Sequence, residues 1–344
     1  MKRSRSENTG IIAPAEPAEE LMVWQALNLA LNHALEADDS LFILGEDVGL
    51  YGGSYRVTQG LYAKYGDWRV RDAPISENSF TGLGVGAAMV GGRPVVEIMT
   101  VNFALLALDA IVNMAAKLRY MSGGKIRVPL VIRMPGGVAR QLAAQHSQRL
   151  EHTLMNVPGL RILVPSTPQD SYWQLTQAIR EDDPMIVLEH ALLYFAKGPF
   201  DPAAPPPPPH QAALRREGED VTLVAWSRMV QVCLDAAQQL AGEGIKAEVI
   251  DLRSLRPIDL PAIQTSVDKT HRCIVVEEDC RFAGAGAEII AELCRRSFFS
   301  LDAPPQRIAA ADVPTPYNGE LEARSIPQAA DVVEAVRKLV SKRG

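Results

Sequence analysis

The stretch Leu41-Phe42-Ile43-Leu44-Gly45-Glu46-Asp47-Val48 decides the fold class. Its first four residues are apolar, so a strand formed from them has no polar face. Such strands are typical of a parallel sheet that helices cover on both sides. Similar short runs, rich in Val, Ile and Leu and bounded by Gly, Pro or Asp, recur at residues 94–99, 129–133, 161–164 and 185–188.

Helical patterns separate these strands. Apolar residues recur at helical spacing in residues 21–35, 79–90, 104–119 and 169–180. Strands that alternate with helices predict an α/β fold with a mainly parallel sheet flanked by helices.

A proline-rich segment divides the chain. Pro205 to Pro209 are five consecutive prolines, which cannot enter a helix or a central strand. The alternation then resumes, with strands expected at 221–225, 247–252 and 273–277 and helices at 230–241, 285–295 and 328–340. The 344 residues therefore predict a disordered tail (1–20), a first domain (21–198), a linker (199–217) and a second domain (218–344).

Composition narrows the function classes. The formal net charge is −6 with both signs mixed along the chain, which argues against nucleic acid or an anionic membrane as a partner. No apolar run approaches the roughly 20 residues that span a bilayer. The four cysteines form no C-x-x-C pair and lie at no metal-like spacing from the histidines. We expect a cytoplasmic protein if the source is bacterial.

A glycine motif and a pair of charged residues could suggest binding sites, but the surrounding sequence does not support either. Gly82-x-Gly84-x-x-Ala87 matches a relaxed dinucleotide fingerprint, yet it lies inside a helical pattern instead of at a strand-to-helix turn. Small residues there favour close packing of the helix. Asp251 and Arg253, at the end of an expected strand, are interpreted as solvated charges.

Five ordered segments carry more information than these. They are 44–48 (LGEDV), 72–78 (DAPISEN), 99–103 (MTVNF), 120–124 (YMSGG) and 143–148 (AAQHSQ). Three of them lie at strand ends or in the loops that follow, where open α/β sheets place their ligands.

With these segments the sequence resembles the β subunits of the decarboxylating component of 2-oxo acid dehydrogenase complexes, a transketolase-like family. The resemblance extends from about Leu21 to the C-terminus and includes residues 244–253 and 311–317. It implies a first domain of the type that binds the pyrimidine of thiamine diphosphate and a second, transketolase C-terminal-type domain used in assembly. Residues 136–142 and 148–151 look most like the pyruvate-specific members, while acetoin and branched-chain 2-oxo acids stay open as substrates.

The resemblance assigns roles to four side chains. It implies that Glu77 hydrogen-bonds a pyrimidine nitrogen and activates the cofactor, a task that suits a buried carboxyl group. Phe103 would pack on the pyrimidine ring, and Glu46 would position it or relay protons. His146 would transfer protons on the substrate side. Each has a plainer alternative: a carboxylate at a helix N-terminus for Glu77, a core ring for Phe103, a solvated acid for Glu46 and a structural histidine for His146.

Ions and partners follow from the same resemblance. Some members hold K⁺ near positions that match Leu130, Ala178, Glu181 and Asp183, although Glu181 and Asp183 depart from the usual Asp and Asn. No Gly-Asp-Gly run, which would hold the diphosphate and its Mg²⁺, occurs in the chain. The resemblance therefore implies a separate α subunit that holds Mg²⁺, an α₂β₂ heterotetramer, a 2-oxo acid substrate, and transfer of the acyl group to a lipoyl transacylase core.

Overall fold

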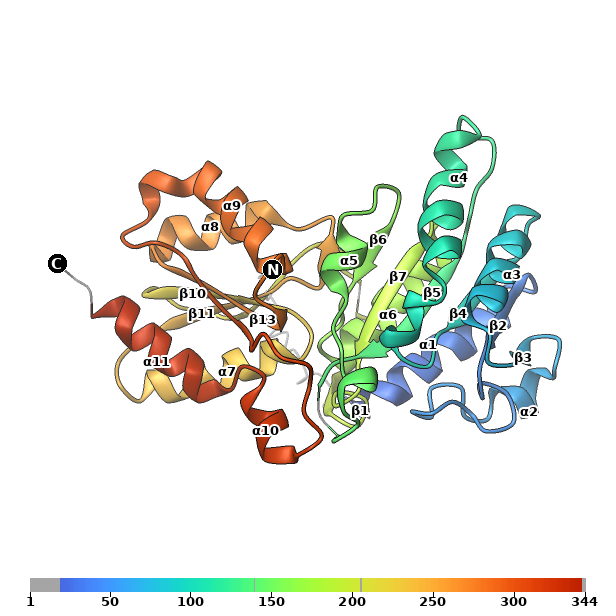
Figure 1. Cartoon of the computed structure of the whole chain (residues 1–344), viewed down its shortest axis with the longest axis horizontal. Helices are drawn as coiled ribbons and strands as arrows, with labels where there is room; N and C mark the ends of the chain where they lie inside the picture. The colour runs from blue at the N-terminus through green and yellow to red at the C-terminus, as the bar shows by residue number, and fades with distance from the viewer. Residues whose placement is uncertain (1–18, 139, 205, 342–344) are drawn as a thin grey trace, which may run out of the picture.

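The computed structural model describes residues 19–138, 140–204 and 206–341. They form two domains that lie side by side, each built on a sheet with helices on both faces (Figure 1). Most of the predicted tail, residues 1–18, lies outside the described residues. Residues 19 and 20, which were assigned to that tail, begin strand β1 (Glu19–Met22).

The first domain contains a seven-stranded sheet in the order β12-β6-β7-β5-β4-β2-β3. Its strands are β2 (Leu41–Gly45), β3 (Val70–Asp72), β4 (Arg93–Glu97), β5 (Val131–Gly136), β6 (Arg161–Leu163), β7 (Met185–His190) and β12 (Ser254–Arg256). All are parallel except β12, which pairs with β6 in the antiparallel direction. The predicted parallel sheet is confirmed.

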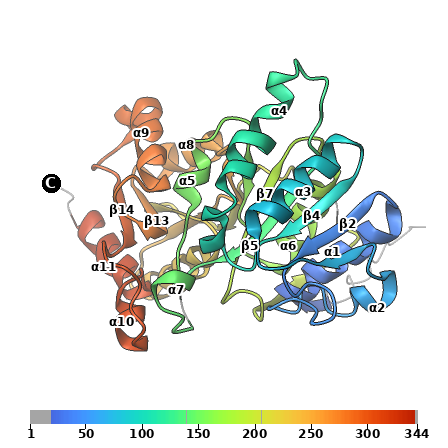
Figure 2. The same ribbon diagram turned by 45° about the vertical axis from the view of Figure 1, so that its right-hand side comes forward.

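Two layers of helices cover this sheet. The helices α1 (Val23–Ala37) and α6 (Pro168–Arg180) pack on one face, against side chains such as Leu41 and Ile43. On the other face, α3 (Glu77–Met89) packs with α4 (Ala116–Met121) and the turns before it, against side chains such as Leu44 (Figure 2). Successive strand residues point to opposite faces, so a strand that is apolar at every position supplies both layers.

One predicted helix differs from expectation. Residues 104–119 were expected to form a single regular helix, but the segment has a 3₁₀ turn (Val101–Leu105), a π-helical stretch (Asp109–Ala115) and then α4. The apolar periodicity correctly placed Ile111 and Ala115 in the core. Periodicity specifies which face is buried and leaves the hydrogen-bond register undetermined.

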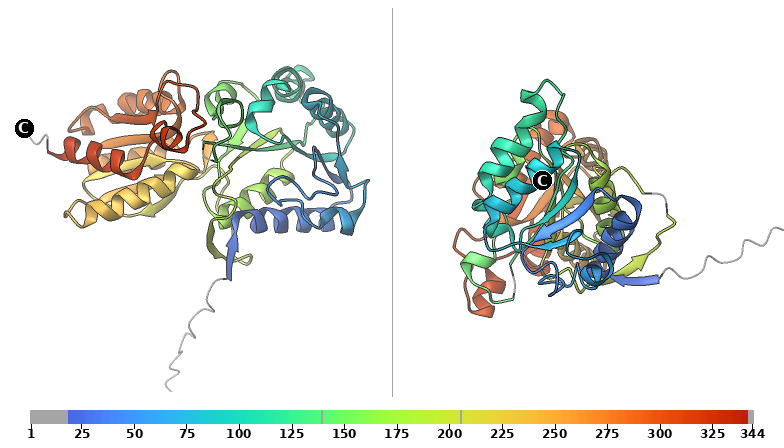
Figure 3. Two further views of the ribbon diagram at one scale, coloured as in Figure 1. Left: turned by 60° about the horizontal axis from the view of Figure 1, so that its bottom comes forward. Right: turned by 90° about the vertical axis from the view of Figure 1, so that its right-hand side faces the viewer.

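The second domain has a five-stranded sheet in the order β14-β13-β10-β11-β9. Its strands are β9 (Ala213–Arg216), β10 (Val221–Ala225), β11 (Ala247–Asp251), β13 (Cys273–Cys280) and β14 (Gln306–Ala310). Its helices are α7 (Arg228–Ala241), α8 (Leu260–Thr270), α9 (Ala285–Ser297), α10 (Gly319–Arg324) and α11 (Ala329–Val340). The left view of Figure 3 shows this domain beside the first.

The domain boundary is less sharp than the proline run suggests. The strand β8 (Lys197–Phe200), which crosses the start of the expected linker, pairs with β1, and β9 inside the linker joins the second sheet. Conversely, β12 belongs to the second domain by sequence but pairs with β6 at the edge of the first sheet. The two domains therefore share backbone pairing as well as side-chain contacts.

Candidate active site at the carboxyl edge of the first sheet

The parallel strands of the first sheet bring the four predicted site residues to one edge, whereas the segment 120–124 lies beside the amino ends of β6 and β7. Glu46 follows β2, Glu77 begins α3 after β3, and Phe103 follows β4. His146 lies in the loop after β5. In the sheet, β2 lies between β3 and β4. The chain therefore runs from β2 to β3 on one side of β2 and then crosses to β4 on its other side, which reverses the strand order. Open α/β sheets usually bind their ligands beside such a reversal, at the carboxyl ends of the strands. This position, which carries Glu46, Glu77 and Phe103, is called the crevice below.

Glu46 and Glu77 form a pair of buried carboxyl groups at this edge. Their exposed fractions are 5% and 3%. Burial raises the pKa of Glu46, and the nearby charges of Glu77 and Asp47 raise it further. Among the described residues, no cation forms a salt bridge with either carboxylate.

Two buried polar atoms near the Glu46–Glu77 pair lack hydrogen-bond partners among the described residues. The Oε1 atom of Glu46 is buried and has no hydrogen-bond partner among the described residues, and the same holds for the Oγ1 atom of Thr81. Thr81 lies one helical turn after Glu77 on α3, so the two side chains share a helix face. Native proteins rarely leave buried polar atoms without a partner unless a ligand or water supplies one. These residues therefore fit a polar ring that both donates and accepts hydrogen bonds.

Close backbone packing fixes the position of Glu46. A Cβ atom on Gly45 would lie 2.5 Å from the carbonyl oxygen of Glu97, so only glycine lets β2 approach β4 this closely. After the strand, Asp47 adopts a left-handed conformation with φ of 55°. The Asp72 carboxylate accepts hydrogen bonds from the Gly49 N–H (2.6 Å) and ties the loop to β3.

The segments that carry Phe103 and His146 contact each other. The Phe103 and His146 rings meet edge to face with their centroids 5.4 Å apart. Behind them, Asn102 Nδ2 donates to Gln148 Oε1 at 2.7 Å. Thr100 Oγ1 donates to Asn102 Oδ1 at 3.0 Å. Phe103 is half-buried and His146 is exposed, so the pair presents an aromatic surface and a titratable group at the rim of the crevice.

A second charge cluster, which sequence reasoning missed, lies on the opposite face of the same sheet edge. Arg133 of β5 forms ion pairs with Glu97 of β4 and Glu189 of β7, and the Tyr194 hydroxyl donates to Glu189. All four side chains are buried. The signal was available in the sequence, since Arg133 interrupts an otherwise apolar strand and needs buried carboxylates as neighbours.

Asp251 and Arg253 also differ from expectation, because both are fully buried instead of solvated. Asp170 of α6 accepts from Arg253 Nε at 2.7 Å, and Arg215 Nε donates to Asp251 at 3.0 Å. The partner of Arg253 therefore comes from the first domain, 83 positions earlier in the chain. A pattern read along one strand could not reveal it.

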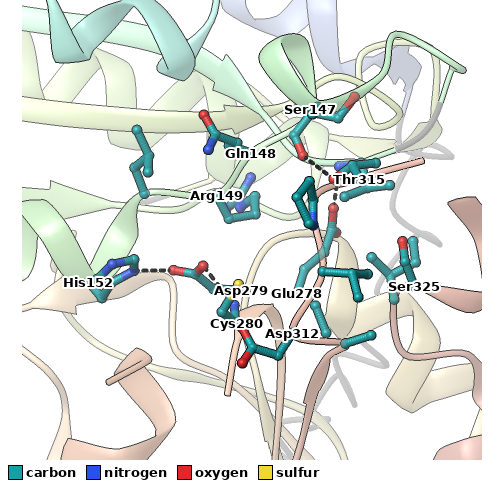
Figure 4. Close-up of a pocket in the computed structure, with 18 residues that line it drawn as sticks. Ser147, Gln148, Arg149, His152, Glu278, Asp279, Cys280, Asp312, Thr315 and Ser325 are labelled. Carbon is teal, nitrogen blue, oxygen red and sulfur yellow. Dashed lines mark hydrogen bonds and ion pairs between the residues drawn. The ribbon is translucent and has the colours of Figure 1, made fainter. Parts of the chain in front are cut away.

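A cavity of about 360 Å³ lies between the two domains (Figure 4). Ser147, Gln148 and Arg149 line it on the side of the first domain, and Glu278 and Asp279 on the side of the second. His152 of α5 (Glu151–Met155) bridges the domains through a 2.5 Å contact with Asp279. That contact raises the pKa of His152. Glu46, Glu77 and Phe103 do not line this cavity.

The structure shows what surrounds the four residues of the predicted potassium site. Glu181 pairs with Arg161 at 3.0 Å and Asp183 with Arg119 at 2.5 Å, each through one carboxylate oxygen. The carbonyl oxygens of Leu130 and Ala178 each accept one backbone N–H and keep a second lone pair. Potassium binding stays a prediction that rests on backbone oxygens.

Among the residues that the structure describes, no three or more His, Cys, Asp or Glu side chains are arranged to hold a metal ion. None of the helices in these ranges is long and apolar enough to cross a bilayer.

Comparison with known proteins gives matches over nearly the whole chain. Residues 19–196 match the family model for the transketolase pyrimidine binding domain, and residues 210–332 match that for the transketolase C-terminal domain. The chain is 48% identical over 321 residues to the pyruvate dehydrogenase E1 component subunit beta of Gracilaria tenuistipitata var. liui, covering 93% of this chain and 99% of the relative. It is 46% identical over 342 residues to the mitochondrial subunit beta-1 of Arabidopsis thaliana, covering 98% and 94%.

Among solved structures, the fold is similar to that of a split-gene transketolase described as an inactive beta4 tetramer. The TM-score is 0.76 at 24% identity, covering 94% of this chain and 99% of the other. This likeness concerns the fold alone.

Proposed function

The chain belongs to the family of pyruvate dehydrogenase E1 component β subunits, and we propose that its crevice forms one half of a thiamine diphosphate site. The reaction is the oxidative decarboxylation of pyruvate with transfer of the acetyl group to lipoyl-lysine. The observation that carries the assignment of the crevice is the buried Glu46–Glu77 pair, in which the Glu46 Oε1 atom has no hydrogen-bond partner among the described residues.

We assign to Glu77 the hydrogen bond to a pyrimidine nitrogen. Its position at the first residue of α3 holds the carboxyl group at the sheet edge, and its burial excludes bulk water from the bond. The cofactor, when bound, supplies the carbon nucleophile and electron sink that decarboxylation of a 2-oxo acid requires. The chain's own contribution is to exchange a proton at the Glu77 carboxyl oxygen in a site of low polarity.

Glu46 and Phe103 have supporting roles in this proposal. Burial and the nearby charges of Glu77 and Asp47 raise the pKa of Glu46, and its Oε1 atom, without a partner among the described residues, is available for a hydrogen bond with the cofactor. The half-buried ring of Phe103 offers an apolar surface on which a flat heterocycle can stack.

His146 is suited to proton transfer on the substrate side. Its exposed imidazole touches Phe103 at the rim of the crevice, where an incoming substrate or lipoyl group would arrive. Histidine can both take and release a proton near neutral pH.

A separate α subunit completes the site in this account. The chain lacks the Gly-Asp-Gly run for diphosphate and Mg²⁺. Around the crevice it also exposes large apolar side chains, including Ile75, Leu105 and Leu106. Apolar side chains gathered beside an incomplete site support burial by a partner subunit. An α₂β₂ assembly, docking to a lipoyl transacylase core and a cytoplasmic location stay predictions, since several relatives bear the words mitochondrial or chloroplastic in their names.

Reconstitution tests the proposal. The purified chain is expected to be inactive with pyruvate, thiamine diphosphate and Mg²⁺, and to gain activity when its α partner is added. A substrate panel of pyruvate, a branched-chain 2-oxo acid and acetoin on the reconstituted pair defines specificity. Full activity of the isolated chain would contradict the split site.

A further inference from the structure

The loop that carries His146 has an unusual backbone. Among the described residues between β5 and α5, three that are not glycine adopt positive φ angles: Arg140 (138°), Gln141 (56°) and Ala143 (60°). Side chains disfavour this region, so such residues persist only where surrounding contacts hold them. Ala143 leads directly into the short 3₁₀ turn Ala144–His146. The orientation of His146 therefore depends on whatever fixes the backbone just before it.

Those contacts come from the second domain, beginning with Glu322 of α10. Its Oε1 atom accepts the Gln141 N–H at 3.0 Å, and its Oε2 atom accepts the Arg140 N–H at 3.4 Å. Gln141 also packs on α10, where a Cβ atom on Gly319 would lie 3.2 Å from the Gln141 Cδ atom.

The surroundings of Glu322 show that these bonds are its main interactions. Its exposed fraction is 5%. Among the described residues it forms no salt bridge, unlike Glu320 on the same helix, which is exposed and pairs with Arg324. A buried carboxylate without a cation depends on N–H donors for its stability. Here those donors are the strained residues of the loop.

Glu278 of β13 holds the start of the loop. Its Oε1 atom accepts the Val138 N–H at 2.5 Å, and its Oε2 atom accepts the His190 Nε2–H at 2.8 Å. The Leu192 N–H donates to His190 Nδ1, so the proton of the neutral ring is on Nε2 and faces Glu278. Burial raises the pKa of Glu278, but the contacts with His190, Arg149 and Val138 outweigh it and lower the pKa to about 2. Glu278 is therefore ionised at any physiological pH.

A third contact closes the far end of the loop. Thr315 Oγ1, which precedes α10, donates to the Ser147 carbonyl oxygen at 3.0 Å (Figure 4). The second domain thus contacts the loop before, within and after its strained residues. Gly137 permits the tight entry, because a Cβ atom there would lie 2.2 Å from His190 Nε2.

We propose that the second domain sets the position of His146, with Glu322 as the positioning residue that holds Arg140 and Gln141 in their strained conformation. The proposal rests on the proposed function for the role of His146, whereas the hold on the loop stands on the contacts alone. It gives the second domain a part in the reaction beyond assembly.

The first test measures the hold itself. Glu322→Ala, Glu322→Gln and the control Glu320→Ala are each assembled with the α partner. Amide hydrogen exchange is followed in the peptides that contain Val138, Arg140 and Gln141. Loss of the carboxylate is expected to speed exchange at Arg140 and Gln141 by at least about tenfold, because these amides lose their acceptor. Glu322→Gln keeps one carbonyl acceptor and should fall between. Exchange equal to that of the Glu320→Ala control would overturn the proposal.

The second test measures the consequence for turnover. Glu322→Ala is expected to lower kcat by about tenfold to a hundredfold with KM for pyruvate within about twofold, since misplacement of a reacting group by about 1 Å has effects of this size. In a His146→Ala background, the same substitution should add less than about twofold. An undiminished loss in that background would show that Glu322 acts on stability and not through His146, and would refute the proposal.

The two tests separate the possible failures. If His146→Ala alone leaves turnover unchanged, the proposed role of His146 fails, and the exchange measurement still decides whether Glu322 holds the loop. If Glu322→Ala does not assemble, Glu322→Gln carries both measurements, with intermediate exchange and an intermediate kcat as the expected result.

Discussion

The two faces of one sheet edge hold buried glutamates in opposite circumstances. On the α1 side, Glu97 and Glu189 both form ion pairs with Arg133. On the α3 side, Glu46 and Glu77 are equally buried but form no salt bridge with any residue that the structure describes. Burial of a charge is costly unless it is paired, so the first set is a structural cluster and the second requires another explanation. The difference shows that pairing, more than burial, distinguishes a structural carboxylate from one available to a ligand.

Removing the cation of the paired cluster should have the largest effect on stability. Arg133→Leu leaves Glu97 and Glu189 buried without compensation, and the free energy of unfolding should fall by about 3–5 kcal/mol. Urea unfolding of the variant and the native chain at pH 7 measures this. A loss below about 1 kcal/mol would mean that the cluster is not structural, and the contrast between the two faces would fail.

On the α3 side, removing the charge of Glu46 should leave the stability unchanged or raise it, in contrast to the loss expected for Arg133→Leu. The folded-state pKa of Glu46 is raised, so its contribution to stability is greatest below the unfolded-state pKa and is lost as the pH rises through the folded-state value. At pH 7, Glu46→Gln should therefore unfold with the same or a higher free energy than the native chain, by up to about 1 kcal/mol. Glu189→Gln is the matched comparison on the other face and should destabilise, because it removes a buried carboxylate that pairs with Arg133. A destabilised Glu46→Gln would place Glu46 among the structural residues.

The smallest effect on stability is expected for the His152–Asp279 contact between the two domains. The hydrogen bond from His152 to Asp279 raises the histidine pKa, so its stabilisation is complete below the unfolded-state value of about 6.5 and is lost as the pH rises through the folded-state value. Because His152 is partly exposed, the contribution should stay below about 1 kcal/mol. The difference in unfolding free energy between native chain and His152→Asn should be larger at pH 6 than at pH 9. A difference that is the same at both values would remove the histidine charge from the interface.

Much of the fold could be predicted from the sequence because strands apolar on both faces leave few alternatives to a parallel sheet. The same holds for the location of Glu46, Glu77 and Phe103, since parallel strands bring their carboxyl ends to one edge. Contacts between distant segments could not be predicted in this way. Arg253 resembled a solvated charge until α6 supplied Asp170.

The contacts that fix the His146 loop could not be predicted either, because they also join segments that are distant in the sequence. Glu322 lies in a short helix among charged residues, a pattern that indicates an exposed surface. Only the packing of the two domains buries it against Gln141. Strained residues such as Arg140 and Ala143 have no reliable sequence signal, because their conformation is imposed by tertiary contacts.

The central claim is that the unpaired carboxylates form this chain's half of the cofactor site. Its most direct test is turnover of pyruvate by Glu77→Gln assembled with the α partner, with Glu46→Gln beside it and the unfolding free energy of each measured in parallel. The account predicts that Glu77→Gln assembles, keeps native stability or exceeds it, and loses at least about a hundredfold in kcat, the scale of a lost proton-transfer group. A kcat within about twofold of the native enzyme would contradict it.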